Sequence, residues 1–177
     1  MFTIRSNSPS YDPQAVQPMR DELKAVGFTE LLTPEDVDKA INVQNDETVL
    51  VMINSVCGCA AGSARPGISL ALQNDVIPDK IYTGFAGMEK DAVNKIRSYV
   101  EGFPPSSPSV AMFKNGKLIS FMPRYQIEGR TPEEIAAAWK EVFNSQCSKK
   151  GPSVPKEHFE QVVYAKTCGS KIPLRSS

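Results

Sequence analysis

Hydrophobic residues recur along the chain at helical and strand spacings that divide it into alternating elements. From about residue 13 to 26, apolar side chains return every three or four positions until Gly27, which predicts an amphipathic helix. Thr33-Pro34 predicts the start of a second helix, ending near Asn45, because threonine caps helix N-termini and proline is tolerated in the first turn. The unbroken apolar run from 48 to 53 is rich in β-branched residues and predicts a strand buried on both faces.

The middle of the chain continues this alternation. Residues 60–74 have a helical pattern that contains Pro66-Gly67. We expect a kink there, because proline cannot donate to the helical hydrogen-bond ladder. A strand over 80–85 and a helix over 88–100 follow. Strand, helix and strand in this order predict a crossover between two parallel strands.

A hairpin and one more helix complete the pattern. Residues 109–113 and 117–122 are strand-like, and the Asn115-Gly116 pair between them is the strongest short-range hairpin signal. The last clear helix starts at Thr131 and runs to about Cys147. Its first turn contains the spacing of a capping box, formed by Thr131 and Glu134.

The order of these elements predicts the fold class. A crossover unit followed by an antiparallel hairpin indicates an α/β domain of the thioredoxin-like fold, with a mixed central sheet and helices on both faces. We assign this domain to residues 13–147. Residues 1–12 are polar and rich in Ser and Pro, and are expected to be a flexible N-terminal arm. Residues 148–177 are expected to form a C-terminal extension.

Composition excludes several classes of function. Of the 177 residues 41% are hydrophobic, enough for a core, and 20 Lys+Arg balance 20 Asp+Glu. This balance gives no basic surface for nucleic acid, and the longest apolar run is too short to span a bilayer. The first residues lack the apolar stretch of a secretory signal, so we expect a cytoplasmic protein. In such a reducing compartment the four cysteines are more often catalytic, metal-binding or buried than structural.

Cys57 and Cys59 directly follow the predicted central strand and precede a predicted helix. Free backbone N–H groups and the helix dipole favour a thiolate at Cys57, and the thiolate is the reactive form. Side chains two residues apart do not face each other in a regular helix. A Cys57–Cys59 disulfide therefore needs irregular backbone, which Gly58 can supply. We predict a redox pair in which Cys57 is the more reactive thiol, with Gly58 in the substrate-binding surface.

Two neighbouring cysteines can also be buried packing residues or ligands of a soft metal. A zinc site needs four ligands, and the other candidates lie far along the chain and are unpaired: Cys147, His158 and Cys168. We expect His158 on the surface, Cys147 half-buried on the last helix and Cys168 exposed. The sequence therefore assigns no metal site.

Two further residues are candidates for the substrate site. Thioredoxin-like folds carry a cis proline before the hairpin strand, against the active-site sulfurs, and Ser107-Pro108 stands at that place. Bonds before proline are usually trans, so only the fold argument predicts a cis bond here. Arg65 is either a solvated side chain or a ligand for a carboxylate on a small thiol substrate.

Several motifs together resemble the bacilliredoxin family of bacterial thioredoxin-like proteins. They lie between about Pro13 and Cys147 and are Asn54-Ser55-Val56-Cys57-Gly58-Cys59-Ala60-Ala61-Gly62 with Ala64-Arg65-Pro66, Phe85-Ala86-Gly87, Pro104-Pro105-Ser106-Ser107-Pro108-Ser109, Pro123-Arg124 and Ile127-Glu128-Gly129-Arg130. The segment after Cys147 exceeds the usual length of the family.

The resemblance implies a thiol–disulfide oxidoreductase that removes bacillithiol from mixed disulfides on other proteins. Cys57 matches the family's nucleophile and Cys59 its resolving cysteine. The implied partners are bacillithiolated or disulfide-containing proteins and a low-molecular-weight thiol, with no cofactor apart from bacillithiol as the substrate thiol. Two alternatives stay open: a disulfide isomerase or general thiol oxidoreductase, and a dithiol module that binds a soft metal.

Overall fold

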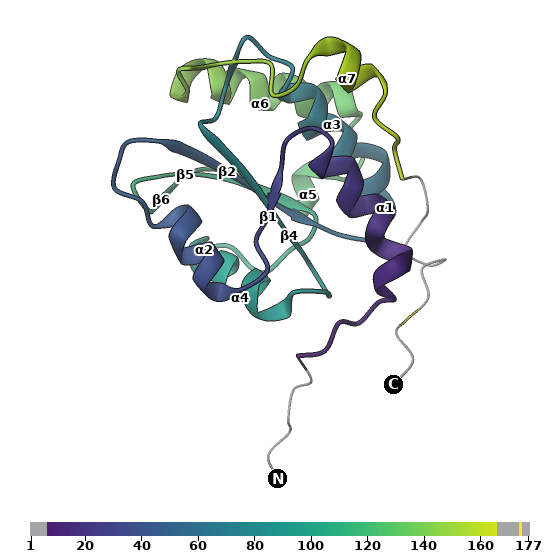
Figure 1. Cartoon of the computed structure of the whole chain (residues 1–177). Helices are drawn as coiled ribbons and strands as arrows, with labels where there is room; N and C mark the ends of the chain where they lie inside the picture. The colour runs from purple at the N-terminus through teal and green to yellow at the C-terminus, as the bar shows by residue number, and fades with distance from the viewer. Residues whose placement is uncertain (1–6, 166–173, 175–177) are drawn as a thin grey trace.

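A five-stranded mixed sheet forms the centre of the protein, in a computed structural model that describes residues 7–165 and Leu174. The strands of this sheet are β1 (Thr29–Glu30), β2 (Thr48–Asn54), β4 (Lys80–Phe85), β5 (Ser109–Lys114) and β6 (Lys117–Met122). Their spatial order is β1-β4-β2-β5-β6 (Figure 1). The first three strands in this order are parallel, and the β5–β6 hairpin is antiparallel to β2.

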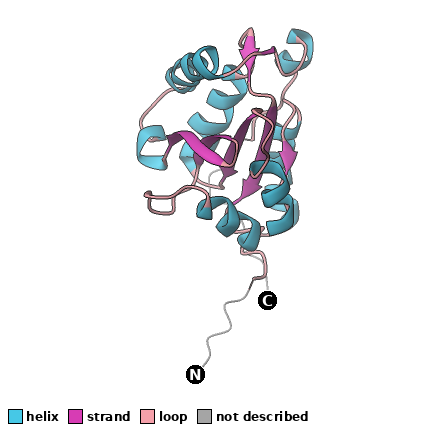
Figure 2. Ribbon diagram, turned by 90° about the vertical axis from the view of Figure 1, so that its left-hand side faces the viewer, coloured by secondary structure: helices cyan, strands magenta, loops and turns pink. Residues whose placement is uncertain are grey.

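Helices cover both faces of the sheet, as the two views show (Figures 1 and 2). The helices on one face are α1 (Pro13–Lys24), α3 (Arg65–Ala71) and α6 (Pro132–Gln146), and those on the other are α2 (Pro34–Ile41) and α4 (Lys90–Ser98). All seven residues of β2 are buried, as expected for a central strand. Its side chains alternate between the two faces: Leu50 and Met52 pack with α3 and α6, whereas Val51 and Ile53 pack with α2 and α4. The predicted thioredoxin-like α/β fold is confirmed.

The helix caps and the hairpin turn that the sequence indicates are present in the structure. Thr33 and Asp36 form a reciprocal capping box at the start of α2. In the capping box predicted for α6, the Glu134 N–H donates to the Thr131 hydroxyl oxygen at 3.2 Å. Between β5 and β6, Asn115 and Gly116 have φ angles of 50° and 74°, the left-handed conformation that a tight hairpin requires.

The helix after the two cysteines is irregular before Pro66 rather than at it. A π-helical segment, η1, spans Ala60–Ala64 and leads into α3, and the Arg65 N–H donates to the Ala60 carbonyl, five residues back. Pro66 has no N–H to continue the ladder, which removes one donor where the helix changes type. The irregular backbone expected near Cys59 therefore lies in the turn that follows it.

Besides the two-residue strand β1, four short elements in the described part of the chain have no counterpart in the sequence prediction. They are β3 (Val76–Ile77), α5 (Arg124–Ile127), β7 (Lys149–Lys150) and α7 (Lys156–Glu160). β3 and β7 pair antiparallel as a separate small sheet. This pairing brings the start of the C-terminal extension to the end of α3.

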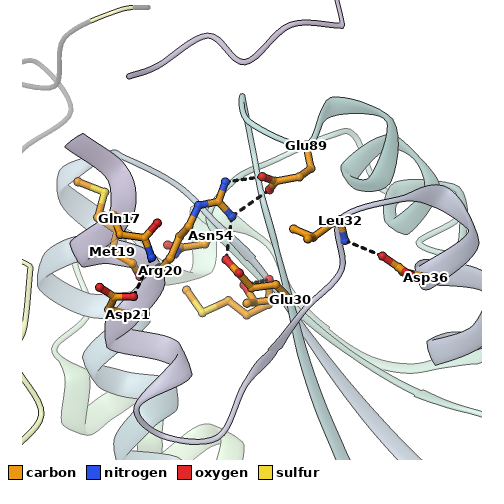
Figure 3. A network of polar contacts seen from close by, with 11 residues as sticks. Gln17, Met19, Arg20, Asp21, Glu30, Leu32, Asp36, Asn54 and Glu89 are labelled. Atoms are coloured by element: carbon orange, nitrogen blue, oxygen red, sulfur yellow. Dashed lines mark hydrogen bonds and ion pairs between the residues drawn. The ribbon is translucent and has the colours of Figure 1, made fainter. Parts of the chain in front are cut away.

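Helix α1 is anchored at the carboxyl edge of the sheet by Arg20. Its guanidinium lies between Glu30 of β1 and Glu89, which precedes α4 (Figure 3). The guanidinium also stacks over the Phe85 ring. Before α1, the Ser10 N–H donates to the Gly87 carbonyl at 2.7 Å. None of the helices in the part of the chain that the structure describes is both long and apolar enough to cross a membrane.

Candidate active site

The two cysteines lie in the turn between β2 and the helix, where the sequence places them. Helical backbone begins at Gly58, which is exposed, and both cysteine side chains are half-buried. The Cys57 and Cys59 sulfurs are 2.8 Å apart and both are free thiols. The predicted pair is thus brought together, close enough for one sulfur to attack a disulfide formed by the other.

The surroundings of Cys57 favour its thiolate. Burial acts to raise the pKa of the Cys57 thiol, but hydrogen bonds from Cys59, Ser55 and the Ala60 N–H, with the charge of Arg124, outweigh it and lower that pKa. The Ala60 nitrogen lies 3.4 Å from the sulfur, which is the helix-mouth contact that the sequence predicts. Cys57 is therefore the thiol prepared to react first.

Burial and the interaction with Cys57 favour the neutral thiol form of Cys59. Burial, the hydrogen bond to Cys57 and the negative charge of Cys57 raise the pKa of Cys59 to about 11. Arg124 acts in the opposite direction on this thiol and does not outweigh them. The two thiols therefore differ in how readily they ionise, and their roles as attacking and resolving thiol stay predictions.

Arg65 is placed differently from either prediction made for it. Its side chain has no exposed surface, so it is not solvated and does not offer its guanidinium to a substrate carboxylate. Instead Nη1 donates to the Ser55 carbonyl at 2.9 Å and to Asn54 Oδ1 at 3.1 Å. Arg65 therefore stabilises the backbone turn that carries Cys57, from the buried side of that turn.

A buried carboxylate, Glu22 of α1, is the ion-pair partner of Arg65. Arg65 Nε and Glu22 Oε2 are 2.8 Å apart and neither side chain is exposed. Burial raises the pKa of Glu22, and Arg65 partly opposes this. The sequence carries one signal for this pair: Glu22 stands within the apolar stripe of Met19, Leu23 and Val26, where a charge needs a partner.

The Ser107–Pro108 peptide bond is cis, as predicted. Ser109, the next residue, pairs with Ile53 near the end of β2, so Pro108 lies at the same edge of the sheet as the turn with the cysteines. A direct contact between the Pro108 ring and the sulfurs stays a prediction.

Arg124 is a site residue that the sequence reasoning named only as part of a motif. Its Nη1 donates to the Ser107 carbonyl, the carbonyl of the cis peptide bond, at 3.3 Å, and its Nε pairs with Glu128 at 2.5 Å. Its charge acts on both thiols. No periodicity marks this arginine, because it stands on the four-residue helix α5.

The remaining candidates lie apart from the pair. His158 is exposed, as predicted, and Cys147 is half-buried with its sulfur 3.8 Å from the Met112 sulfur. Burial raises the pKa of Cys147, which disfavours its thiolate. Cys168 lies outside the described residues. Within residues 7–165 and Leu174, no three His, Cys, Asp or Glu side chains gather as a metal site would require.

Comparison with known proteins assigns the family. Residues 11–147 match the protein family described as Disulphide isomerase. The chain is 48% identical over 134 residues to a protein named Bacilliredoxin from Cytophaga hutchinsonii, covering 76% of this chain and 98% of that protein. It is 49% identical over 137 residues to a bacilliredoxin of Halalkalibacterium halodurans, covering 77% and 94%. The chain belongs to the bacilliredoxin family.

Membership in the bacilliredoxin family makes this chain a thiol–disulfide oxidoreductase. A bacilliredoxin of Staphylococcus aureus is 44% identical over 144 residues, covering 81% of this chain and 98% of that protein. Among solved structures, a thioredoxin of Malassezia sympodialis matches with a TM-score of 0.42 and 17% identity, covering 65% of this chain and 90% of that one. Mitochondrial thioredoxin 3 of Saccharomyces cerevisiae matches with a TM-score of 0.45 and 15% identity, covering 68% and 97%.

Proposed function

We propose that the protein removes bacillithiol from mixed disulfides on other proteins, with Cys57 as nucleophile and Cys59 as resolving thiol. The observation that carries the proposal is the 2.8 Å dithiol whose two pKa values are displaced in opposite directions. The names of the relatives supply the choice of bacillithiol as the small thiol.

Capture is a single thiol–disulfide exchange. The Cys57 thiolate attacks the bacillithiol sulfur of the mixed disulfide, a Cys57–bacillithiol disulfide forms, and the target protein leaves as a thiolate. Arg124 is close enough for its positive charge to act on the reacting thiolate. No metal or other cofactor takes part in this scheme.

Capture prepares the second step by changing the surroundings of Cys59. While Cys57 is a thiolate, its hydrogen bond and its charge contribute to the raised pKa of Cys59. A Cys57 sulfur in a disulfide carries no charge, so both effects disappear and the pKa of Cys59 falls. The Cys59 thiolate then attacks Cys57, a Cys57–Cys59 disulfide forms, and bacillithiol leaves as a thiolate. A separate reductant must return the pair to the dithiol.

Single cysteine variants test the scheme with a bacillithiol-capped protein and intact mass measurement of both partners. Cys59→Ser should accumulate Cys57 carrying the bacillithiol mass, because the first step is intact and the second is blocked. Cys57→Ser should capture nothing, and the distant Cys147→Ser serves as the control with unchanged turnover. Undiminished removal of the cap by Cys57→Ser would reject Cys57 as the nucleophile.

A second candidate function is disulfide isomerisation, because the matching family is described by that activity. An isomerase uses the same Cys57 thiolate but attacks disulfides within a misfolded protein and needs no small-thiol cap. The rates of cap removal from bacillithiol-capped and glutathione-capped forms of one protein separate the two functions. A strong preference for the bacillithiol-capped form supports the proposal, whereas equal rates favour the general oxidoreductase or isomerase.

A further inference from the structure

The C-terminal extension continues beyond β7 as a strap, residues 151–165, that lies along α1 and α3 (Figure 1). The Ser153 N–H donates to the Leu72 carbonyl at 2.9 Å, and its hydroxyl donates to the Val26 carbonyl at 2.7 Å. Further along, Phe159 and Val162 pack against the hydrophobic core to which both helices contribute. The strap thereby uses carbonyls that the ends of α1 and α3 leave free.

The last residue of the strap, Ala165, completes the buried Arg65–Glu22 pair. Its carbonyl accepts from Arg65 Nη2 at 3.0 Å, and its N–H donates to Glu22 Oε2 at 3.1 Å. The N–H and the carbonyl of this one residue thus bind both charged partners. Buried ions need hydrogen bonds in addition to each other to offset the loss of water.

Arg65 also binds the turn that carries Cys57. Its Nη1 binds the Ser55 carbonyl and Asn54 Oδ1, and Asn54 Oδ1 also accepts from the Ser55 N–H at 2.8 Å. Ser55 is therefore held on both sides of its backbone. Its hydroxyl accepts from the Cys57 N–H at 3.2 Å and also hydrogen-bonds the Cys57 sulfur, which lowers the pKa of that thiol.

We propose that the strap is a positioning element of the dithiol site: Ala165 fixes the Arg65 guanidinium, Arg65 fixes Ser55, and Ser55 orients the nucleophile Cys57. The inference rests on the proposed function only in taking Cys57 as the attacking thiol. The matched family region ends at residue 147, before the strap begins. The strap thus adds to this chain a support for the nucleophile.

The test is a proline at position 165 in the full-length chain. Ala165→Pro removes the N–H that binds Glu22. The matched control is Val163→Pro, which places the same residue in the strap at a side chain that is 83% exposed. The readout is the pH dependence of iodoacetamide alkylation at Cys57, which needs no bacillithiol substrate. Failure of the proposed substrate therefore leaves this test intact.

Ala165→Pro is expected to raise the pKa of Cys57 toward the ordinary thiol value. At neutral pH we expect alkylation to slow about threefold, the result of raising a thiol pKa by about half a pH unit. Val163→Pro should keep the wild-type pH profile. A strap that only covers apolar surface would lower the thermal midpoint in Ala165→Pro without moving the pH profile, and that result overturns the proposal.

Amide hydrogen exchange of the wild-type chain tests the same contact if Ala165→Pro does not fold. The Ala165 N–H should be protected to a degree similar to the Ser55 N–H, because both belong to one hydrogen-bonded unit. An Ala165 amide that exchanges at the rate of an unstructured peptide, while Ser55 is protected, overturns the proposal.

Discussion

Two identical side chains, Cys57 and Cys59, differ chemically because their neighbours differ. The Cys57 sulfur accepts hydrogen bonds at the mouth of the helix, and each bond favours its negative charge. Cys59 donates toward that charge and must stay protonated to do so. The division of roles is thus a property of the pair, since removing one thiol changes the pKa of the other.

The pH dependence of alkylation follows from this coupling. Because the pKa of Cys57 is lowered, its alkylation rate should rise and level off at a lower pH than for a free cysteine. Cys59 in the reduced protein should react only as the pH nears about 11. In Cys57→Ser the Cys59 profile should move to lower pH, because the Cys57 charge is gone. Mass mapping of labelled peptides across the pH range measures each profile, and coincident wild-type profiles would contradict the assignment.

The buried ion pair makes a second prediction at the residue scale. Arg65→Met leaves Glu22 buried without its partner, and we expect the free energy of unfolding to fall by about 3 to 5 kcal/mol. Lys156→Met, which breaks the exposed pair with Glu160, is the control and should change stability little. Denaturant unfolding followed by circular dichroism compares the two. Equal losses in both variants would show that burial of the pair does not decide its importance.

At the scale of elements, the site is held by the close approach of α3 and α6. A Cβ atom at Gly67 would lie 2.8 Å from the Ile135 Cβ and Cγ2 atoms and 3.2 Å from the Pro132 carbonyl oxygen. Glycine is therefore required here by packing and not by backbone conformation. The same approach fixes α3, which carries Arg65, against the sheet.

Gly67→Ala should consequently lose stability although alanine is the better helix former. Overpacking of a core contact costs about 1 to 3 kcal/mol, more than the helix propensity gained. The control is Gly62→Ala, where an added Cβ meets nothing within 4 Å. Thermal unfolding should show a lower midpoint for Gly67→Ala and an unchanged or higher midpoint for Gly62→Ala. A more stable Gly67→Ala would show that α3 and α6 separate easily.

At the scale of the whole molecule, the extension after residue 147 is part of the folded body through residue 165. β7 pairs with β3, and the Gly151 N–H donates to the Asp75 carbonyl at 2.7 Å. A Cβ atom at Gly151 would lie 2.1 Å from the Asn74 carbonyl oxygen, so the backbone of the extension meets the end of α3 directly. Segments far apart in sequence thus share one packing unit.

Gly151→Ala should lift this start of the extension away from α3. The added methyl group meets backbone, which cannot move aside as a flexible side chain would. We expect hydrogen exchange at the Ser153 N–H to accelerate, with a lower thermal midpoint than in Ser148→Ala, a variant at an exposed position. Unchanged protection of Ser153 would show that its bond to Leu72 forms independently of Gly151.

The sequence by itself determined the order of the main elements and the reactive pair. An unbroken apolar run identified the central strand, and Asn115-Gly116 and Thr33-Pro34 identified a turn and a helix start, because these signals act between near neighbours. Cys57 and Cys59 were found for the same reason, as two thiols adjacent in sequence at the end of a buried strand. The cis bond at Pro108 followed from the fold and not from its own residues.

Only the tertiary structure decided which distant groups meet. Glu22, Arg65 and Ala165 lie 43 and 100 residues apart along the chain, and no local pattern links a helical glutamate to a peptide group in the extension. The same holds for Arg124, whose charge reaches the cysteines because α5 folds back over the cis peptide bond. Periodicity records which face of an element is buried, whereas the partner on that face is set by how the elements pack. The surroundings that make Cys57 reactive are therefore a product of packing.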